Sequence, residues 1–411
     1  MTDAPLHHDI VIAGAGPVGL AFARSLKGSG LSILIVDPQP EEALAAPAFD
    51  GREIALTHRS MAILTELGVR DRLDPADISD LRQAQVTNGT APHALQFEPQ
   101  DRSGGRLGVL VPNHRIREAL YRLTVDQPGV DIRAGRRIVQ ARIRPGTQRQ
   151  PGGAALRLDD GTALTAGLLV AADSRFSTVR TQLGVGADLH PLGRSMIVCR
   201  VRHDRDHDHV AAECFDHGQT LAFLPLNPDA DGFRSSIVLT LPTAAAEDLA
   251  QASDAVFEAE LNRRARGRLG AIRVISPRHL YPLTVTWSRR FAGEGFALIG
   301  DAAVGMNPVT AHGFNLGLKG QDRLARQVLK AHARGRPIGD ASHLAAFEAG
   351  HRRDALPLYA ETNAIARLFS DERLPARALR KAVLKTAQKL PPFRHAVSAM
   401  LTDGGARPVR F

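Results

Sequence analysis

Three glycines near the start of the chain constrain its fold more than any other feature. They follow an apolar run over residues 9–13 and form the pattern G-x-G-x-x-G. Such a run is typical of a buried parallel strand, and the pattern is typical of the turn between that strand and a helix. We expect Gly14 to permit the tight turn, Gly16 to let a pyrophosphate approach the backbone, and Gly19 to let the helix pack closely.

The residues that follow have the spacing of a dinucleotide-binding unit. A helix over roughly residues 17–28 would direct its N-terminus at the pyrophosphate, where free N–H groups and the helix dipole favour anions. A second apolar run, residues 33–36, ends in Asp37. An acidic side chain at this distance from the glycines can accept hydrogen bonds from the adenosine ribose. The alternative is a glycine turn that only packs a helix against a strand.

A second motif near the other end of the chain narrows the choice of dinucleotide. An apolar run over residues 295–299 leads into Gly300 and Asp301, and the motif continues through Asn307–Gly317. This second motif and the glycine pattern together favour FAD as the dinucleotide. Segments near both ends of the sequence would then bind the same cofactor. Taken alone, Gly300 and Asp301 are equally typical of an ordinary strand-to-helix turn in which the aspartate caps the helix.

Composition limits the remaining classes of protein. The length of 411 residues, 44% of them hydrophobic, predicts two or three domains. The net charge of +9 is spread along the chain, and with three tyrosines and one tryptophan we expect a solvated surface and no nucleic-acid partner. Two cysteines make no disulfide framework, and no signal peptide or membrane-length apolar run is apparent. We therefore expect a cytoplasmic protein, with peripheral association with the inner membrane as the alternative.

The patterning along the chain predicts an α/β fold with an inserted sheet. We expect helices over residues 53–67 and 113–125, a β-meander over 129–170, and a helix over 252–264. Strand-like runs separated by Pro and Gly between residues 186 and 280 predict a second, sheet-based domain. We assign residues 1–75, 105–185 and 285–345 to a Rossmann-like FAD-binding domain, residues 76–104 and 186–284 to a substrate domain, and residues 346–411 to a helical C-terminus.

Four motifs together resemble the FAD-dependent aromatic hydroxylases, and among them the ubiquinone-biosynthesis hydroxylases of the UbiH/UbiF/Coq6 family. The motifs are the glycine pattern, Asp50–Leu56, Ala172–Arg180 and Gly300–Gly317. Within the last, Met306–Asn315 is most similar to the UbiM branch. The resemblance implies an FAD-binding domain of the aromatic hydroxylase type. The chain departs from the usual family pattern at Ser174, Val304, Ala311 and His312.

The resemblance also implies roles for individual residues. Asp301 would accept hydrogen bonds from the flavin ribityl chain, and the helix beginning near Gly313 would direct its N-terminus at the pyrimidine edge of the flavin. Pro308 would lie beside the flavin ring and the reacting substrate. His312 would influence the reactivity of the flavin or assist proton transfer from a phenol. Alternatively, it is a histidine packed in a turn. The other implied FAD contacts are Gly14, Gly16, Gly19, Asp37, Arg52, Asn113, Arg117, Asp173 and Asn315.

The implied reaction is hydroxylation of the aromatic ring of a polyprenylated ubiquinone precursor through a C4a-hydroperoxide of the flavin, with the C5 position favoured. It needs FAD, molecular oxygen and an electron donor, NADPH or another reductant. One alternative is a hydroxylase of a soluble phenol. Another is a catalytically silent flavoprotein that scaffolds a quinone-biosynthesis complex. A flavin halogenase is expected to carry Trp-x-Trp, which a chain with Trp287 alone cannot supply.

Several of these positions have a simpler interpretation. Arg52 could instead be a surface arginine, and Asp173 is equally a candidate turn cap. The alternating His and Asp residues of His203–His209 suggest a metal site, but they also fit a solvated loop, and we expect no metal. The stretch Ala378–Leu390 predicts a helix with a basic face. That face would either contact an anionic membrane or a partner, or remain solvated while the helix packs on the flavin domain.

Overall fold

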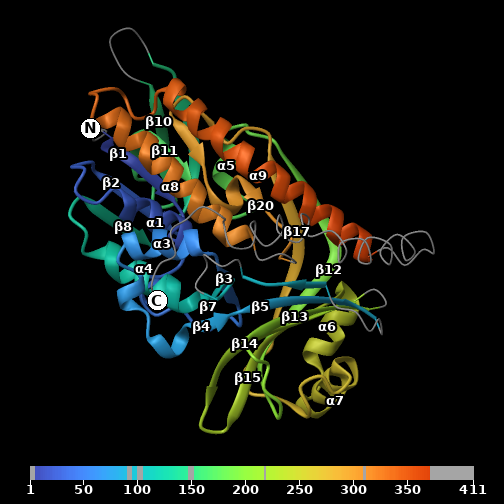
Figure 1. Ribbon diagram of the computed structural model, residues 1–411. Helices are drawn as coiled ribbons and strands as arrows, with labels where there is room; N and C mark the ends of the chain where they lie inside the picture. The colour runs from blue at the N-terminus through green and yellow to red at the C-terminus, as the bar shows by residue number, and fades with distance from the viewer. Residues whose placement is uncertain are drawn as a thin grey trace.

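Two large β-sheets and one small sheet organise the chain (Figure 1). The structure is a computed structural model that describes residues 5–89, 95–99, 105–146, 152–216, 219–308 and 312–370. An eight-stranded first sheet carries the glycine motif, and a nine-stranded second sheet contains the strand-like runs predicted between residues 186 and 280. The α/β fold class predicted from the sequence is confirmed.

The first sheet is parallel at its centre, in the order β18-β19-β11-β1-β2-β8. The C-terminal halves of its middle strands β1 and β11 are buried because helices pack on them, and Ile10, Val11 and Ile12 have no exposed surface. Helix α1 packs against both α4 and α8. The elements are β1 (Leu6–Ala13), α1 (Pro17–Ser25), β2 (Ile33–Asp37), α4 (Asn113–Val125), β8 (Val130–Ala134), β9 (Ile138–Arg144), β10 (Gly153–Leu158), β11 (Ala163–Ala171), β18 (Ala292–Gly293), β19 (Phe296–Leu298) and α8 (His312–His332).

The predicted β-meander over residues 129–170 is only partly correct. Strands β9, β10 and β11 are antiparallel neighbours, as a meander requires. Strand β8 instead pairs in parallel with β2, with Val130 opposite Ile33 and Ile132 opposite Ile35. The alternation of side chains along a strand shows which face is buried, but it does not identify the neighbouring strand.

The predicted helix over residues 53–67 is wrong at its start. Residues Glu53–Leu56 form strand β3, which pairs antiparallel with β7 (Gly108–Pro112) in a small sheet completed by β4 (Ser79–Leu81). Helix α3 (His58–Glu66) begins only after Thr57, whose hydroxyl oxygen accepts a hydrogen bond from the Ser60 amide at 3.2 Å. The non-local pairing with β7 overrides the local helical pattern.

The second sheet has the order β20-β17-β12-β15-β14-β13-β5-β6. One face is covered by α6 and α7, so that Ile197, Cys199 and Val201 pack with Phe257 and Leu261. Figure 1 shows these helices at the end of the molecule away from β1 and β2. The elements are β5 (Gln83–Asn88), β6 (Leu95–Phe97), β12 (Ala187–His203), β13 (Val210–Asp216), β14 (Gln219–Asp229), β15 (Gly232–Pro242), α6 (Thr243–Gln251), α7 (Asp254–Ala265), β16 (Ile272–Val274), β17 (His279–Ser288) and β20 (Val304–Gly305).

The C-terminal part of the described chain is helical, since α9 (Ala341–Ser370) runs alongside α8. The predicted basic helix Ala378–Leu390 lies outside the described residues. No helix among the described segments is long and apolar enough to cross a membrane. The domain boundaries remain a proposal, which the separate sheets support, although β20 from the predicted FAD-binding domain pairs with β17 of the second sheet. Two short helices, α2 (Glu41–Ala45) and α5 (Thr178–Gln182), complete the fold.

A buried ion pair joins the small sheet to the second sheet. Arg200 on β12 donates to Glu53 Oε1 on β3 from Nη2 at 2.6 Å and from Nε at 2.8 Å. The Glu53 side chain has no exposed surface, and its Oε2 has no hydrogen-bond partner in the described part of the chain. Burial raises the pKa of Glu53 to about 7 in spite of the nearby guanidinium.

This pKa predicts how stability depends on pH. Between the unfolded pKa of 4.5 and the folded pKa of about 7, native Glu53 holds a proton that the unfolded chain has lost. The stability that this residue contributes is therefore complete below the unfolded pKa and is lost as pH rises through the folded pKa. Glu53→Gln still pairs with Arg200 but cannot ionise. We therefore compare the melting temperature of the wild type with that of Glu53→Gln. The wild-type value minus the variant value should be a few degrees lower at pH 8 than at pH 5.

Calorimetry of the FAD-loaded proteins at both pH values measures this difference. Glu66→Gln, an exposed substitution on α3, is the matched control and should follow the wild type at both pH values. A constant difference between the wild type and Glu53→Gln would contradict the raised pKa.

Candidate cofactor site and active site

The glycine turn has one open position. A side chain at Gly14, whose φ is +108°, would place its Cβ 2.6 Å from the Ala172 carbonyl oxygen, and one at Gly19 would lie 2.1 Å from the Gly14 carbonyl oxygen. These two glycines are required by the packing of the protein itself. At Gly16, by contrast, a Cβ would meet no atom within 4 Å. Gly16 is the N-cap of α1, so the open space lies where backbone N–H groups favour a pyrophosphate.

Asp37 is held rigidly beside this turn. It ends β2, is 6% exposed, and accepts hydrogen bonds from the Ala15 amide at 2.7 Å and from the Gln39 amide at 2.8 Å. Each carboxylate oxygen has a second lone pair for a ligand hydroxyl. Arg117 on α4 donates to Gln39 Oε1 at 3.1 Å, which places it next to the same loop. Burial is the largest influence on Arg117 and lowers its pKa.

Asp50, which the sequence analysis did not select, connects two predicted site residues. Its Oδ2 accepts hydrogen bonds from Arg52 Nη2 at 2.6 Å and from Asn113 Nδ2 at 2.7 Å. Burial alone would raise the pKa of Asp50, but the Arg52 charge and these hydrogen bonds hold it below the ordinary value. Tyr281 on β17 donates its hydroxyl hydrogen to the Asp50 carbonyl oxygen at 2.6 Å, and its ring lies 5.4 Å from the Arg52 guanidinium. Arg52 is therefore oriented by its neighbours, although its side chain is 42% exposed.

Asp301 is held by the middle motif of the sequence. It lies in a 3₁₀ turn, Gly300–Ala302, and its Oδ2 accepts hydrogen bonds from Arg175 Nη2 at 2.6 Å and Nε at 3.1 Å. Arg180, which is 2% exposed, donates to the Ala302 carbonyl oxygen at 2.9 Å. The Asp301 side chain remains 37% exposed, so it can still meet a ligand. Both arginines belong to the quoted motif Ala172–Arg180, but their partners could not be predicted from the motif.

Asp173 is hydrogen-bonded to the start of a helix whose N-cap is Ser177. Its Oδ2 accepts a hydrogen bond from the Thr178 amide at 3.0 Å, at the first residue of α5. Its Oδ1 is buried and has no hydrogen-bond partner among the described residues. The backbone of Asp173 lies against Gly14, since a Cβ on that glycine would be 2.9 Å from the Asp173 Cα atom. A direct contact with the cofactor stays a prediction.

Asn315 links α8 to the small sheet. Its Oδ1 accepts a hydrogen bond from the Thr57 amide at 3.1 Å, and its Nδ2 donates to the Ala55 carbonyl oxygen at 2.8 Å. These bonds position the start of α8, where His312 and Gly313 lie. Pro308 is exposed just before residues 309–311, which are outside the described ranges. The cofactor and substrate contacts of these four residues remain predictions.

The two ends of the chain meet at Val18 on α1. A Cβ on Gly317 would lie 2.9 Å from Val18 Cγ2, and one on Gly300, whose φ is +58°, would lie 3.3 Å from the same atom. The helix that follows the glycine turn thus packs directly on the Gly300–Gly317 motif. The open space at Gly16, the fixed carboxylate of Asp37 and the accessible carboxylate of Asp301 fit the pyrophosphate, ribose and ribityl parts of FAD.

The histidine-rich segment begins at the end of β12 and connects it to β13 of the second sheet. His203 Nε2 is hydrogen-bonded to Ser235 Oγ at 2.9 Å, and His207 Nε2 to the Leu226 carbonyl oxygen at 3.0 Å. Within the ranges that the structure covers, no group of three or more His, Cys, Asp or Glu residues is placed to hold a metal ion.

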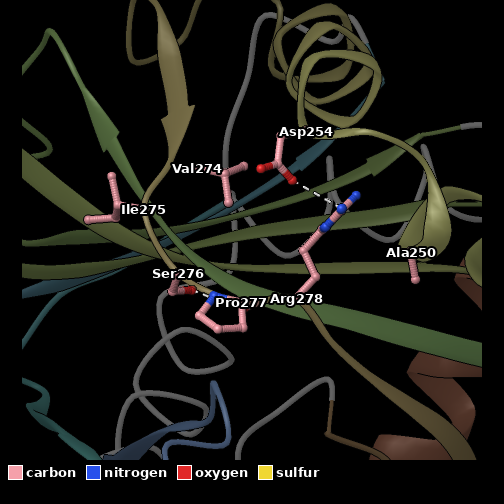
Figure 2. A pocket seen from close by; sticks show the side chains of 7 residues that line it. All are labelled: Ala250, Asp254, Val274, Ile275, Ser276, Pro277 and Arg278. Carbon is pink, nitrogen blue, oxygen red and sulfur yellow. Dashed lines mark hydrogen bonds and ion pairs between the residues drawn. The ribbon is translucent and has the colours of Figure 1, made fainter.

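A separate hollow lies beside α6 and α7 (Figure 2). Across it, Arg278 Nη2 donates to Asp254 Oδ1 at 3.0 Å. None of the predicted site residues contributes to its wall, which consists of Ala250, Asp254, Val274, Ile275, Ser276, Pro277 and Arg278. We assign it no part in the chemistry.

Comparison with known proteins identifies the family. A family model described as an FAD binding domain matches residues 7–352. The chain is 40% identical to ubiquinone hydroxylase UbiM of Neisseria meningitidis over 401 residues, which are 97% of this chain and 85% of the relative. The chain belongs to the UbiH/UbiF/Coq6 family of ubiquinone hydroxylases. It is also 33% identical to ubiquinone hydroxylase UbiL of Rhodospirillum rubrum, over 95% of this chain and 90% of the relative.

The family resemblance noted in the sequence is thereby confirmed, and the protein is an FAD-dependent aromatic-ring monooxygenase. Its fold is that of p-nitrophenol 4-monooxygenase PnpA from Pseudomonas putida DLL-E4, with a TM-score of 0.74. That alignment covers 99% of this chain and 100% of the other at 17% identity, so it is informative for the fold alone.

Substitution of Gly16 tests the position of the pyrophosphate. Gly16→Val should fold normally, because nothing in the protein occupies the space that the new side chain would fill. It should purify largely free of FAD, because valine would exclude the pyrophosphate. Absorbance of the released flavin measures the FAD content, and calorimetry compares both proteins as apoproteins. A fully loaded Gly16→Val protein would refute this placement.

The two aspartates should differ in their effect on FAD. Asp301→Ala should raise the FAD dissociation constant more than Asp173→Ala, because Asp301 is accessible to the ribityl chain whereas Asp173 is hydrogen-bonded to the first residue of α5. Losing hydrogen bonds to a charged group costs about 1.5–3 kcal/mol, or roughly a 10- to 150-fold change in the constant. Flavin fluorescence titration of each apoprotein gives both constants. Equal constants would show that the ordering is wrong.

Proposed function

We propose that this enzyme hydroxylates the aromatic ring of a polyprenylated ubiquinone precursor, with the C5 position favoured. The observation that carries the proposal is the 40% identity to UbiM over 97% of the chain. The proposed substrate is therefore a phenol or quinone ring with a long apolar tail. Contact with a membrane or with a quinone-biosynthesis complex stays a prediction, since Ala378–Leu390 is outside the described residues.

Bound FAD would supply the oxygen chemistry, as a C4a-hydroperoxide formed with molecular oxygen and reducing equivalents from NADPH or another reductant. The residues of the chain would position the cofactor. Asp37 would bind the adenosine ribose, Asp301 the ribityl chain, and Gly16 would leave room for the pyrophosphate. The N-terminus of α8, near Gly313, would stabilise negative charge on the reduced flavin.

The second sheet would provide the wall that holds the substrate ring. The face that α6 and α7 leave uncovered carries partly accessible apolar side chains, among them Ala222, Leu224 and Val238 on the central strands β14 and β15. Such a surface suits an aromatic ring with an apolar tail, because burying it on binding is favourable. Pro308 and His312 would approach the ring from the opposite side.

Isotope labelling tests the reaction. The FAD-loaded enzyme is supplied with a prenylated phenol, a reductant and ¹⁸O₂, and the product is examined by mass spectrometry. We expect one ¹⁸O atom in the new hydroxyl group and accumulation of the unhydroxylated precursor in a strain that lacks the protein. Label derived from water, or normal ubiquinone in a deletion strain without a redundant hydroxylase, would contradict the proposal. Exclusive turnover of a soluble phenol would retain the chemistry and change the substrate.

A further inference from the structure

An acidic residue lies in an apolar row on the second sheet. Strand pairing places Glu213 of β13 between Val86 of β5 and Ala222 of β14. The row continues through Val238 to Val198 and ends at His279. Residues that are directly paired across a sheet project from the same face. Glu213 thus shares one face with four small apolar side chains and one histidine.

This face is directed toward the FAD-binding side of the molecule. The neighbours of Glu213 along its strand, Ala212 and Cys214, pack instead with the cluster under α6 and α7 on the other face. At one end of the row, Val86 packs against a cluster that includes Leu107, the residue before β7. At the other end, a Cβ on Gly51 would lie 2.9 Å from His279 Cδ2. One end of the row is therefore covered by the residue before β7, and the other by Gly51, which is next to the predicted contact Arg52.

The centre of the row is not covered in the same way. Glu213, Ala222 and Val238 are all partly accessible, although they lie on interior strands of a nine-stranded sheet. Glu213 keeps accessible surface although apolar side chains flank it in its row, so a ligand on this face can reach its carboxyl group. The described residues provide no hydrogen bond or ion pair to this carboxyl group. A carboxylate among apolar side chains and without a protein partner is costly, and a ligand that donates a hydrogen bond to it would relieve that cost.

The immediate neighbours of Glu213 carry no charge. On the same face, the positions along and beside its strand are Ala211, Phe215, Ala84, Asn88, Thr220 and Leu224. The charged residue Arg200 shares this face on β12, three strands away, and is paired with Glu53. Burial alone raises the pKa of Glu213 to about 8, with no contribution from a neighbouring charged group. The closest titratable residue in its own row is His279, four strands away.

We propose that Glu213 contacts the aromatic ring of the substrate and accepts the proton of its phenolic hydroxyl group. This rests on the proposed function, because it takes the substrate to be a phenol. The phenolic O–H bond breaks, a new O–H bond forms to a carboxylate oxygen of Glu213, and the electron pair stays on the phenol oxygen. The ring carbons ortho and para to that oxygen become richer in electrons, which favours attack on an electrophilic oxygen atom.

The raised pKa suits this task. A phenol has a pKa of about 10, so a carboxylate with an ordinary pKa of about 4 is a weak acceptor for its proton. A carboxylate with a pKa of about 8 is a much stronger base and is still ionised in part at neutral pH. In wild type, kcat/KM should therefore rise with pH and level off above pH 8.

Glu213→Gln tests the proposal because the amide keeps the shape but cannot accept the proton. In holoenzyme with a geranylated phenol as probe, we expect kcat/KM at pH 8 to fall at least about 100-fold and its rise with pH to disappear. FAD content should be unchanged. Glu213→Asp, which keeps a carboxyl group, should retain the rise with pH at a lower rate. Glu247→Gln, an exposed substitution on α6, is the matched control and should resemble the wild type.

Direct binding separates this inference from the proposed function. The probe and its O-methyl ether, which has no phenolic proton, are titrated into oxidised holoenzyme and followed by flavin absorbance. Wild type should bind the phenol more tightly than the ether, and Glu213→Gln should bind the two alike. An unchanged preference and pH profile in Glu213→Gln would overturn the role of Glu213 and leave the proposed function standing. A wild type that binds and prefers the phenol without hydroxylating it would overturn the proposed function alone.

Discussion

Close backbone packing around the first helix is the constraint on which the rest of the site depends. Gly14 and Gly19 bring β1, α1 and the Ala172 segment within contact distances that exclude any side chain, and Gly300 and Gly317 pack on Val18 from the other side. Segments from the start, middle and end of the sequence therefore meet in one place. Since a side chain at Gly14 or Gly19 would overlap neighbouring backbone atoms, the geometry of the turn is set by the backbone itself.

Polar contacts then fix the side chains on this framework. Arg175 holds Asp301, and Arg180 holds the carbonyl oxygen of Ala302, so the middle motif orients the last one. Asp50 orients Arg52 and Asn113 in a comparable way. The only glycine of the turn that faces open space is Gly16. The side chains that hydrogen bonds hold in place are those that would bind the cofactor. The second sheet instead offers a partly accessible apolar face for a substrate.

Local patterns in the sequence predicted the glycine turn, the helix Asn113–Val125 and the family. They failed where pairing between distant segments decides the structure: Glu53–Leu56 is a strand because of β7, and β8 pairs with β2. The contacts of Arg175 and the position of Glu213 in an apolar row could not be predicted from the sequence either. Both depend on which distant segments lie side by side in the fold. The predicted FAD contacts are placed by the fold, but their roles are still predictions.

A crystal structure of the FAD-loaded protein is the most direct test of the claim that both ends of the chain hold one cofactor. We expect the pyrophosphate beside the Gly16 backbone, the adenosine ribose at Asp37 and the ribityl chain within hydrogen-bond distance of Asp301. The isoalloxazine ring should lie between the start of α8 and the uncovered face of the second sheet. A pyrophosphate away from Gly16, or a ribityl chain that does not reach Asp301, would contradict the account.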